Sequence, residues 1–333
     1  MKRLLITGGA GFIGSNFVHH VLPRWGDAEL VVLDKLTAAG NQENLRDVWE
    51  DPRLRFMRGD IADEAVVRLA MDGCDAVINF AAETHVDRSI LSPREFVFTD
   101  VVGTFTLLEV ARELGVGRFV QVSTDEVYGA AAAGKFDETA SVNPTNPYAA
   151  TKAGADLLAL AYARTFGAPV MLSRSSNNYG PYQHPEKFVP LFVTNALEDK
   201  PLPLYGDGRQ IRDWLYVRDN CEALAVILER GAPGEIYNVG GDCELENRDV
   251  ARRILKLLGK PESLLKSVKD RPAHDRRYAL ESGKMKKLGW KPTTAFDAGL
   301  ENTVRWYAEN EAWWRPLKQG AFAEYYERQY GGR

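Results

Sequence analysis

The sequence is poor in cysteine and histidine, the residues that most often build disulfide frameworks and transition-metal sites. It has 3 cysteines and 5 histidines among 333 residues. Cys74, Cys221 and Cys243 stand far apart, without the paired spacing of a zinc site or the density of a disulfide scaffold. We therefore expect no metal site and no disulfide-stapled secreted domain, and a reducing cytoplasm is the expected location.

The sequence also lacks a strong excess of charge and a long apolar run. Its formal net charge is -4, from 42 basic and 46 acidic residues, so its composition predicts no nucleic-acid partner and no membrane partner. No apolar run is long enough to span a bilayer, and glycines interrupt the one near the start that could otherwise be a signal peptide. With 45% hydrophobic and 26% charged residues, the chain has the composition of a globular enzyme.

Short apolar runs alternate with helical patterns through the first half of the chain. These runs do not alternate with polar residues, so we expect strands buried on both faces, at residues 4–7, 30–33, 54–57, 76–79, 119–123 and 170–173. Helices are expected near 101–111 and 148–166, and again near 219–228, 247–258 and 298–309. The alternation predicts an α/β fold with a doubly wound parallel sheet of the Rossmann type.

The composition changes after residue 173, where proline, glycine and aromatic residues become frequent. We therefore predict a Rossmann domain over residues 1–173 and a smaller C-terminal lobe over residues 174–333, with a segment at about 211–240 returning to the first domain. Ligands of such folds bind at the edge of the sheet where the carboxyl ends of the strands meet.

A glycine-rich segment follows the first expected strand and opens a helix. In TGGAGFIGS, the spacing of Gly8, Gly11 and Gly14 suits a turn that brings backbone N–H groups against a pyrophosphate. Asp34 ends the second strand, where a carboxylate can accept hydrogen bonds from an adenosine ribose and repel a 2′-phosphate. An ordinary glycine-rich turn is the alternative, but this acid favours an NAD site. Further contacts are expected where two other strands end, at Asp60, Ile61, Phe80, Ala81 and Ala82.

Tyr148 and Lys152 in YAATK are four residues apart and share one face of the expected helix. In a protein without a dinucleotide site, a tyrosine and a lysine at this spacing would be an ordinary pair on the surface of a helix. Beside a dinucleotide site, the ammonium of Lys152 and a nicotinamide cation would favour the phenolate of Tyr148. That phenolate could take the proton of a substrate hydroxyl while the same carbon loses a hydride, with Ser123 or Thr124 orienting the hydroxyl.

These motifs together resemble the extended short-chain dehydrogenase/reductase superfamily and, within it, the dTDP-glucose 4,6-dehydratase family. The similarity extends over nearly the whole chain, through segments such as AAETHVDRSI, STDEVYG, YAATKA, SNNYGPYQHPEK and RPAHDRRYA. It implies an NAD-dependent hydro-lyase of deoxysugar biosynthesis. The implied NAD contacts are Gly8, Gly11, Phe12, Ile13, Gly14, Asp34, Lys35, Leu36, Thr37, Asp60, Ile61, Phe80, Ala81, Ala82, Thr99, Ser123, Tyr148, Lys152 and Asn178.

Two adjacent acids, Asp125 and Glu126, distinguish this family from its epimerase and decarboxylase relatives. The resemblance implies oxidation at C4 of dTDP-glucose, removal of the C5 proton by Glu126 and protonation of the departing C6 hydroxyl by Asp125. Hydride then returns to C6 and a proton returns to C5, which gives dTDP-4-dehydro-6-deoxyglucose and water. Two close carboxylates resist double ionisation, so a division into acid and base is physically reasonable. The implied catalytic residues are Thr124, Asp125, Glu126, Tyr148 and Lys152.

The resemblance also implies a nucleotide-sugar site in the C-terminal lobe and a homodimer built through segments near 93–114 and 148–166. Arg212 and Arg271 would bind the diphosphate, because a guanidinium matches its geometry. The chain departs from the family pattern at Ala38 and Ala273. The implied substrate contacts are Thr84, Thr124, Asn177, Lys187, Phe188, Pro203, Leu204, Tyr205, Arg212, Asn247, Arg271 and His274.

Other functions remain open on the sequence. A UDP-sugar 4,6-dehydratase or a C4 epimerase would have the same fold and the same NAD site. A non-catalytic NAD-binding regulator would have the fold without turnover, although intact Tyr148, Lys152, Asp125 and Glu126 argue against it.

Overall fold

A seven-stranded parallel sheet forms the centre of the computed structural model, which describes residues 1–270 and 274–330. Its strand order is β10-β6-β5-β4-β1-β2-β3, so the prediction of a doubly wound α/β fold is confirmed. The first six expected strands all lie in this sheet, with ends within two residues of the predicted ones. The strands are β1 (Arg3–Thr7), β2 (Glu29–Asp34), β3 (Leu54–Arg58), β4 (Ala76–Asn79), β5 (Arg118–Thr124), β6 (Val170–Ser175) and β10 (Ile236–Val239).

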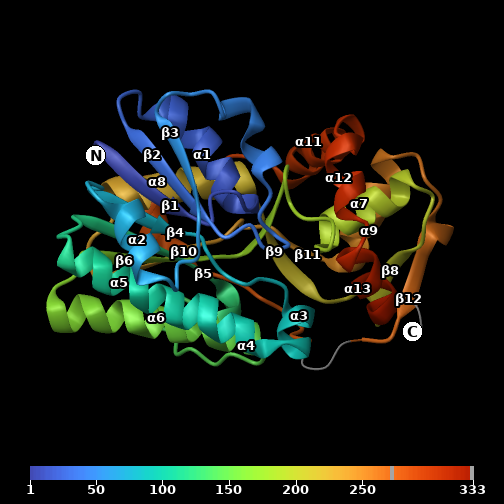
Figure 1. Cartoon of the computed structure of the whole chain (residues 1–333). Coiled ribbons are helices and arrows are strands. Elements are labelled where there is room, and N and C mark those ends of the chain that lie inside the picture. Colours follow the sequence, from blue (N-terminus) through green and yellow to red (C-terminus); the bar gives the residue numbers. More distant parts are fainter. Residues whose placement is uncertain (271–273, 331–333) are drawn as a thin grey trace.

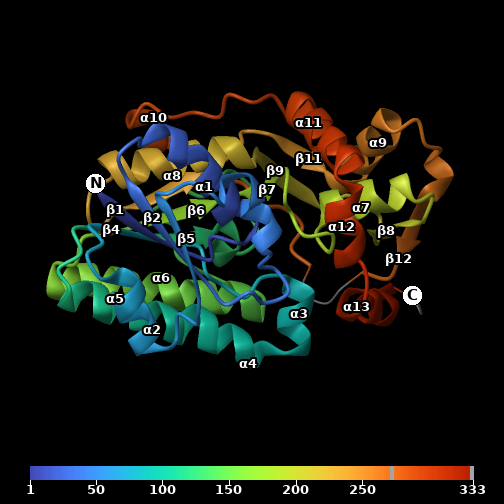
Figure 2. The same ribbon diagram turned by 45° about the horizontal axis from the view of Figure 1, so that its top comes forward.

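Helices cover both faces of this sheet (Figures 1 and 2). One face packs against α1 (Phe12–Arg24) and α8 (Val217–Arg230), the other against α2 (Glu64–Met71), α5 (Thr104–Glu113) and α6 (Pro147–Phe166). Successive residues of a strand point to opposite faces, so Leu4 and Ile6 join one core cluster and Leu5 joins the other. The expected helix near 101–111 instead begins as the π-helix η2 (Val97–Gly103) and continues as α5.

The second part of the chain builds two small sheets and its own apolar core. One sheet contains β7 (Asn177–Tyr179), β9 (Ile211–Tyr216) and β11 (Glu244–Glu246), and the other pairs β8 (Leu202–Tyr205) with β12 (Leu265–Val268). Helices α7 (Phe188–Leu197), α9 (Asn247–Leu257), α11 (Phe296–Glu309), α12 (Glu311–Leu317) and α13 (Ala321–Tyr330) pack around them (Figure 2).

Residues 174–216, for which the sequence predicted no particular strand or helix, form β7, α7, β8 and β9. Strands β7 and β8 have only three and four residues, so their pattern is too short to recognise before their distant partners are known. Helix α7 contains Pro190 in its first turn, where the missing N–H removes no internal hydrogen bond. The predicted division at residue 173 stays a prediction; α8 and β10 lie with the seven-stranded sheet, whereas β9 lies in the second part.

Shorter elements complete the described chain. They are η1 (Gln42–Val48), α3 (Val86–Leu91), α4 (Pro93–Phe96), η3 (Asp125–Tyr128), η4 (Glu262–Leu264) and α10 (Gly283–Lys287). Across residues 1–270 and 274–330, no helix combines the length and the apolar character that crossing a bilayer requires.

Candidate active site

The turn between β1 and α1 is closed so tightly that side chains would not fit at its glycines. Gly8 has φ +66°, and a Cβ there would stand 2.6 Å from the backbone N of Ala81. A Cβ on Gly14 would stand 2.3 Å from the carbonyl O of Gly8. The turn therefore leaves its backbone bare beside the start of α1, where N–H groups and the helix dipole favour an anion. This cradle fits the pyrophosphate of a dinucleotide.

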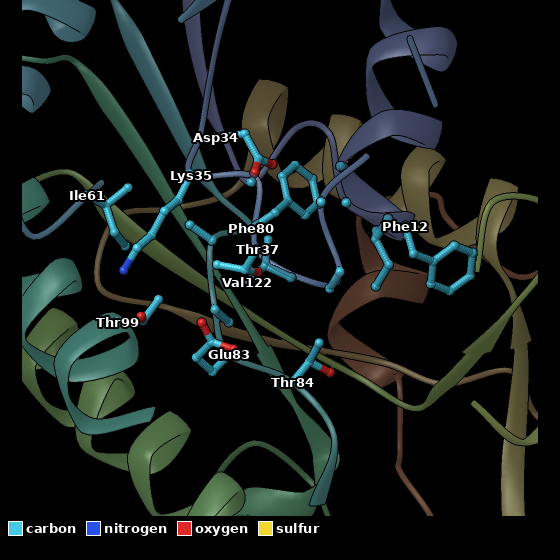
Figure 3. A pocket seen from close by; sticks show the side chains of 18 of the residues that line it. Phe12, Asp34, Lys35, Thr37, Ile61, Phe80, Glu83, Thr84, Thr99 and Val122 are labelled. Carbon is cyan, nitrogen blue, oxygen red and sulfur yellow. The ribbon is translucent and has the colours of Figure 1, made fainter. Parts of the chain in front are cut away.

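A cavity extends from this turn across the carboxyl ends of β2, β4 and β5 (Figure 3). Leu36 and Asn178 are the two expected NAD contacts that lie outside its lining; Asn178 lines the neighbouring cavity instead. The other expected contacts all line it: Gly8, Gly11, Phe12, Ile13, Gly14, Asp34, Lys35, Thr37, Asp60, Ile61, Phe80, Ala81, Ala82, Thr99, Ser123, Tyr148 and Lys152.

The carboxylate of Asp34 is buried at the end of β2 and already accepts two backbone hydrogen bonds. Oδ2 accepts from the N–H of Ala10 at 2.9 Å, and Oδ1 accepts from the N–H of Leu36 at 2.8 Å. Burial raises the pKa of Asp34, and these two hydrogen bonds oppose that shift. A carboxylate oxygen has two acceptor positions, so Asp34 keeps capacity for a ribose hydroxyl while it also fixes the glycine turn.

Asp60 is paired with a lysine in the wall of this cavity. Its Oδ2 lies 2.7 Å from Nζ of Lys35, and its Oδ1 accepts from the N–H of Ala62 at 3.0 Å. Lys35 and Asp60 both line the cavity, so they form one ion pair in its wall. The structure thus assigns Asp60 first to holding Lys35.

Tyr148 and Lys152 lie one turn apart on α6, above the end of β5. Nζ of Lys152 donates to the carbonyl O of Val122 at 2.7 Å, which fixes the buried ammonium beside the strand. Burial, together with Glu126, Asp100 and Asp125, raises the pKa of Tyr148 well above its usual value. The prediction that Lys152 and a nicotinamide cation together favour the phenolate stays a prediction, and burial and the nearby acids oppose it.

The two acids of STDEVYG occupy different environments in η3. Asp125 is 2% exposed, and its Oδ2 has no hydrogen-bond partner within the described residues. Burial raises the pKa of Asp125 well above its usual range, Glu126 and Asp213 raise it further, and Arg212 opposes them. Glu126 is half-buried and lines a second cavity, where Nδ2 of Asn146 donates to its Oε2 at 3.4 Å. The surroundings of Asp125 therefore favour its protonated form.

The second cavity joins the first and contains most of the expected substrate contacts. Gln183, Glu186 and Lys187 line both cavities. Thr84 lines the first cavity only, Thr124 lines neither, and Arg271 lies outside the described residues, as does the departure at Ala273. The expected contacts that line the second cavity are Asn177, Lys187, Phe188, Pro203, Leu204, Tyr205, Arg212, Asn247 and His274.

Arg212 is held in this cavity by backbone acceptors and by an aromatic ring. Its guanidinium donates to the carbonyl O of Ile211 at 2.8 Å and to that of Asp275 at 3.0 Å. It also lies 4.4 Å from the ring centroid of Tyr278, which donates to Oδ2 of Asp275 at 2.7 Å. A guanidinium fixed in this way is suited to a diphosphate.

Sequence reasoning missed Glu186, a buried acid at the junction of the two cavities. Its Oε2 accepts from Nε of Arg88 at 2.7 Å. Burial would raise its pKa, but His85, His184, Lys187 and Arg88 lower it to about 2, so the carboxylate is ionised. Lys187 donates from Nζ to Oγ1 of Thr84 at 2.8 Å. The available sequence signal was the charged pair Glu186 and Lys187 in HPEK, because charged residues are rarely buried without a partner.

Asp100 on η2 is a second buried acid that the sequence analysis did not single out. Its Oδ1 accepts from the N–H of Glu83 at 2.9 Å, and its Oδ2 accepts from Oγ1 of Thr151 at 2.7 Å. Burial raises its pKa to about 6, although Lys152 and both hydrogen bonds oppose that shift. Asp100 thus ties the segment after β4 to the helix that carries Tyr148.

No grouping of three or more His, Cys, Asp or Glu residues in the described ranges could hold a metal ion. The acids described above are instead paired with cations, hydroxyls and backbone N–H groups. The arrangement suits proton transfer beside a dinucleotide.

Comparisons with known proteins agree with this geometry. A family model described as GDP-mannose 4,6 dehydratase matches residues 5–303. The dTDP-glucose 4,6-dehydratase of Streptomyces niveus is 50% identical over 95% of this chain and 96% of its own length. The dTDP-glucose 4,6-dehydratase of Salmonella typhimurium is 46% identical over 99% of each chain.

Solved structures have the same fold over nearly the whole chain. The crystal structure of DesIV, a dTDP-glucose 4,6-dehydratase from Streptomyces venezuelae with NAD and dTDP bound, has a TM-score of 0.93 and 52% identity, covering 95% of this chain and 100% of that one. The UDP-glucose 4-epimerase of Thermus thermophilus in complex with NAD has a TM-score of 0.86 and 33% identity, covering 92% and 99% of the two chains.

Proposed function

The chain belongs to the GDP-mannose 4,6-dehydratase family, and from this premise we propose that it converts dTDP-glucose to dTDP-4-dehydro-6-deoxyglucose and water with NAD as cofactor. It is an NAD-dependent hydro-lyase of the extended short-chain dehydrogenase/reductase superfamily. One observation carries the assignment: the buried carboxyl of Asp125 and the cavity-lining Glu126 stand side by side, next to Tyr148.

The first cavity fits NAD, because its glycine turn leaves room for a pyrophosphate and Asp34 can accept from a ribose hydroxyl. Ser123, Tyr148 and Lys152, at the end of β5, would hold the nicotinamide end. When bound, the nicotinamide accepts the hydride from C4 of the glucosyl unit and later supplies it to C6. Residues of this chain perform the remaining steps.

Tyr148 takes the proton of the C4 hydroxyl. It is a neutral phenol in the protein by itself, so its deprotonation requires a cation beside it; bound nicotinamide is cationic and Lys152 is an ammonium one turn away. Thr124 is an interaction partner of the Tyr148 phenol and lowers its pKa, which supports a role in orienting the same hydroxyl.

Glu126 and Asp125 divide the elimination between them. Oxidation at C4 acidifies the C5 proton, and Glu126 in the cavity wall removes it and gives a proton back to C5 when hydride reaches C6. Burial and the charge of Glu126 raise the pKa of Asp125, which supports its role as the acid that gives a proton to the departing C6 hydroxyl. An epimerase needs no such pair, because its hydride returns to the carbon from which it came.

The nucleotide occupies the second cavity, with Arg212 on the diphosphate and Tyr205, Asn247 and His274 around the nucleoside. The buried Glu186 and Lys187 belong to both cavities, which supports their contact with the sugar where the cavities meet. Three free cysteines support a location in the reducing cytoplasm.

A second copy of the chain covers one apolar face, as the homodimer prediction requires. Large apolar side chains are exposed on η2, α5 and α6, which pack against one another below the central sheet (Figure 1). Phe98, Phe105 and Leu157 are 47%, 45% and 54% exposed, an unusual set for a surface that faces only water. Helices of one face can pair with the same face of an identical copy across a two-fold axis.

The test is incubation of the purified NAD-bound protein with dTDP-glucose and with UDP-glucose, followed by NMR of the products. We expect a 4-keto-6-deoxy sugar and faster turnover of the dTDP substrate. A C4 epimer that keeps its C6 hydroxyl would contradict the dehydratase, and faster turnover of UDP-glucose would contradict the thymidine preference.

A further inference from the structure

The last described helix, α13, is attached to the NAD-binding side of the molecule through Tyr325. This buried tyrosine donates from its hydroxyl to Oδ2 of Asp87 at 3.2 Å. Its ring contacts His85 edge-on at 5.5 Å between centroids, and the guanidinium of Arg88 lies 5.1 Å from its centroid. Tyr325 therefore meets three residues at the start of α3, close after Thr84, and it holds α13 against that segment (Figure 2).

The same carboxylate also binds Tyr205, at the end of β8. The Tyr205 hydroxyl donates to Oδ2 of Asp87 at 3.0 Å and accepts from Nε2 of Gln329 at 2.6 Å. Burial and Asp87 raise the pKa of Tyr205 to about 12, so it is a neutral phenol that can donate to the carboxylate. Both the donor and the acceptor side of this hydroxyl are used, which fixes the direction of the Tyr205 ring.

Tyr330, at the end of α13, stands beside Tyr205 in the wall of the second cavity. The two rings have centroids 5.9 Å apart, and the two hydroxyl oxygens are 3.4 Å apart. Both residues line the cavity that also contains Arg212 and Asn247. Two neighbouring tyrosines give this part of the wall apolar ring surface with hydroxyl groups at its edge, which matches the chemistry of a pyrimidine base.

We propose that α13 completes the nucleotide end of the substrate cavity. Tyr330 contacts the nucleoside of the dTDP-sugar, and Tyr325 and Gln329 are positioning residues that fix Tyr205 directly or through Asp87. This proposal rests on the proposed function for the identity of the nucleotide. It assigns a binding role to a helix that is more than a hundred residues from β8 in the sequence, and it predicts effects on nucleotide affinity rather than on the chemical steps.

Binding of dTDP to the NAD-bound protein, measured by calorimetry, tests the proposal together with KM and kcat for dTDP-glucose. Tyr330→Ala should weaken dTDP binding and raise KM by about tenfold, with kcat at saturating substrate within about twofold of wild type. Tyr325→Phe keeps the ring but loses the bond to Asp87, so we expect KM to rise by about threefold to tenfold. Tyr330→Phe should recover most of the affinity that Tyr330→Ala loses.

Tyr326→Phe is the matched control on the same helix. The Tyr326 hydroxyl accepts from Nδ2 of Asn195 at 3.2 Å, on the side of the lobe core, and the residue does not line the cavity. It should leave KM and dTDP affinity unchanged.

Wild-type affinity for dTDP in both Tyr330→Ala and Tyr325→Phe would overturn the role of α13 and leave the dehydratase intact. A loss of kcat with an unchanged KM would have the same meaning. If the wild-type protein forms no 4-keto-6-deoxy product but these variants bind dTDP more weakly than it does, the dehydratase is overturned and the role of α13 is supported.

Discussion

Asp125 and Glu126 are neighbours in the sequence, yet the fold gives their carboxyl groups different surroundings. The Asp125 carboxyl is buried beside Arg212 and Asp213, whereas Glu126 reaches the wall of the substrate cavity. Burial and the charge of Glu126 favour the protonated form of Asp125. Because the two titrations are coupled, a pH profile will report the pair rather than either acid alone.

Replacing Glu126 by Gln removes the base but keeps the size and shape of the side chain. We expect Glu126→Gln still to oxidise C4, while elimination of water slows by about 10²- to 10⁴-fold. Enzyme-bound NADH should then accumulate, which its ultraviolet absorbance measures after mixing with dTDP-glucose. Glu301→Gln, at an exposed position of α11, is the control. Loss of hydride transfer in a folded, substrate-binding Glu126→Gln protein would contradict this division of roles.

The buried carboxyl of Asp100 predicts a pH-dependent stability. Its pKa is about 6 in the folded protein against an ordinary value of 3.8, so the folded chain binds the proton more tightly than the unfolded chain. Between these values the free energy of unfolding falls as the pH rises, because ionisation is easier in the unfolded state. Asn cannot ionise, so Asp100→Asn should gain stability relative to wild type over this window, by at most about 3 kcal/mol.

Urea unfolding of both proteins at about pH 4 and about pH 7 measures this effect. The free energy of unfolding of Asp100→Asn relative to that of wild type should be larger at the higher pH. An equal difference at both pH values would mean that Asp100 has an ordinary pKa in the folded protein.

At the scale of elements, the turn from β1 to α1 determines whether the cofactor cavity exists. Gly14→Ala would bring a Cβ to 2.3 Å from the carbonyl O of Gly8, a distance that neither backbone can accept without moving. We expect the purified variant to contain less than about a tenth of the wild-type NAD, since a shift of the turn removes N–H groups from the pyrophosphate. Extraction and assay of bound NAD measures this.

Gly26→Ala is the control for that substitution, because a Cβ on Gly26 would meet no atom within 4 Å. It should bind NAD as wild type does. Normal NAD content in Gly14→Ala would show that the cofactor does not depend on this close approach.

At the scale of the whole molecule, the exposed apolar residues of η2, α5 and α6 predict self-association. Phe98→Glu would place a charge in the proposed interface, and burying an unpaired charge costs several kcal/mol. We expect its mass by light scattering to be half that of wild type at low micromolar concentration. Leu257→Glu on α9, in the C-terminal lobe, replaces a residue that is 44% exposed and should leave the mass unchanged. A wild-type monomer would contradict the dimer.

The strands of the central sheet could be predicted because each is a short, continuous apolar run that the sheet buries on both faces. Tyr148, Lys152 and the three glycines could be predicted because their function depends on local spacing. Glu186 and Tyr330 could not, because each reaches the cavities through packing between distant segments. The pKa of Tyr148 could not be predicted for a related reason: it depends on burial and on acids from other elements, which local spacing does not reveal.

The sequence by itself determined the class of fold, the dinucleotide turn and the chemical groups of the reaction, since these rest on short patterns and on residue types. Only the tertiary structure decided which acid of STDEVYG is buried and which lines the cavity, because the burial of a side chain depends on everything packed around it. It also decided that a C-terminal helix stands in the wall of the substrate cavity, since residues far apart in the chain meet only when the core forms.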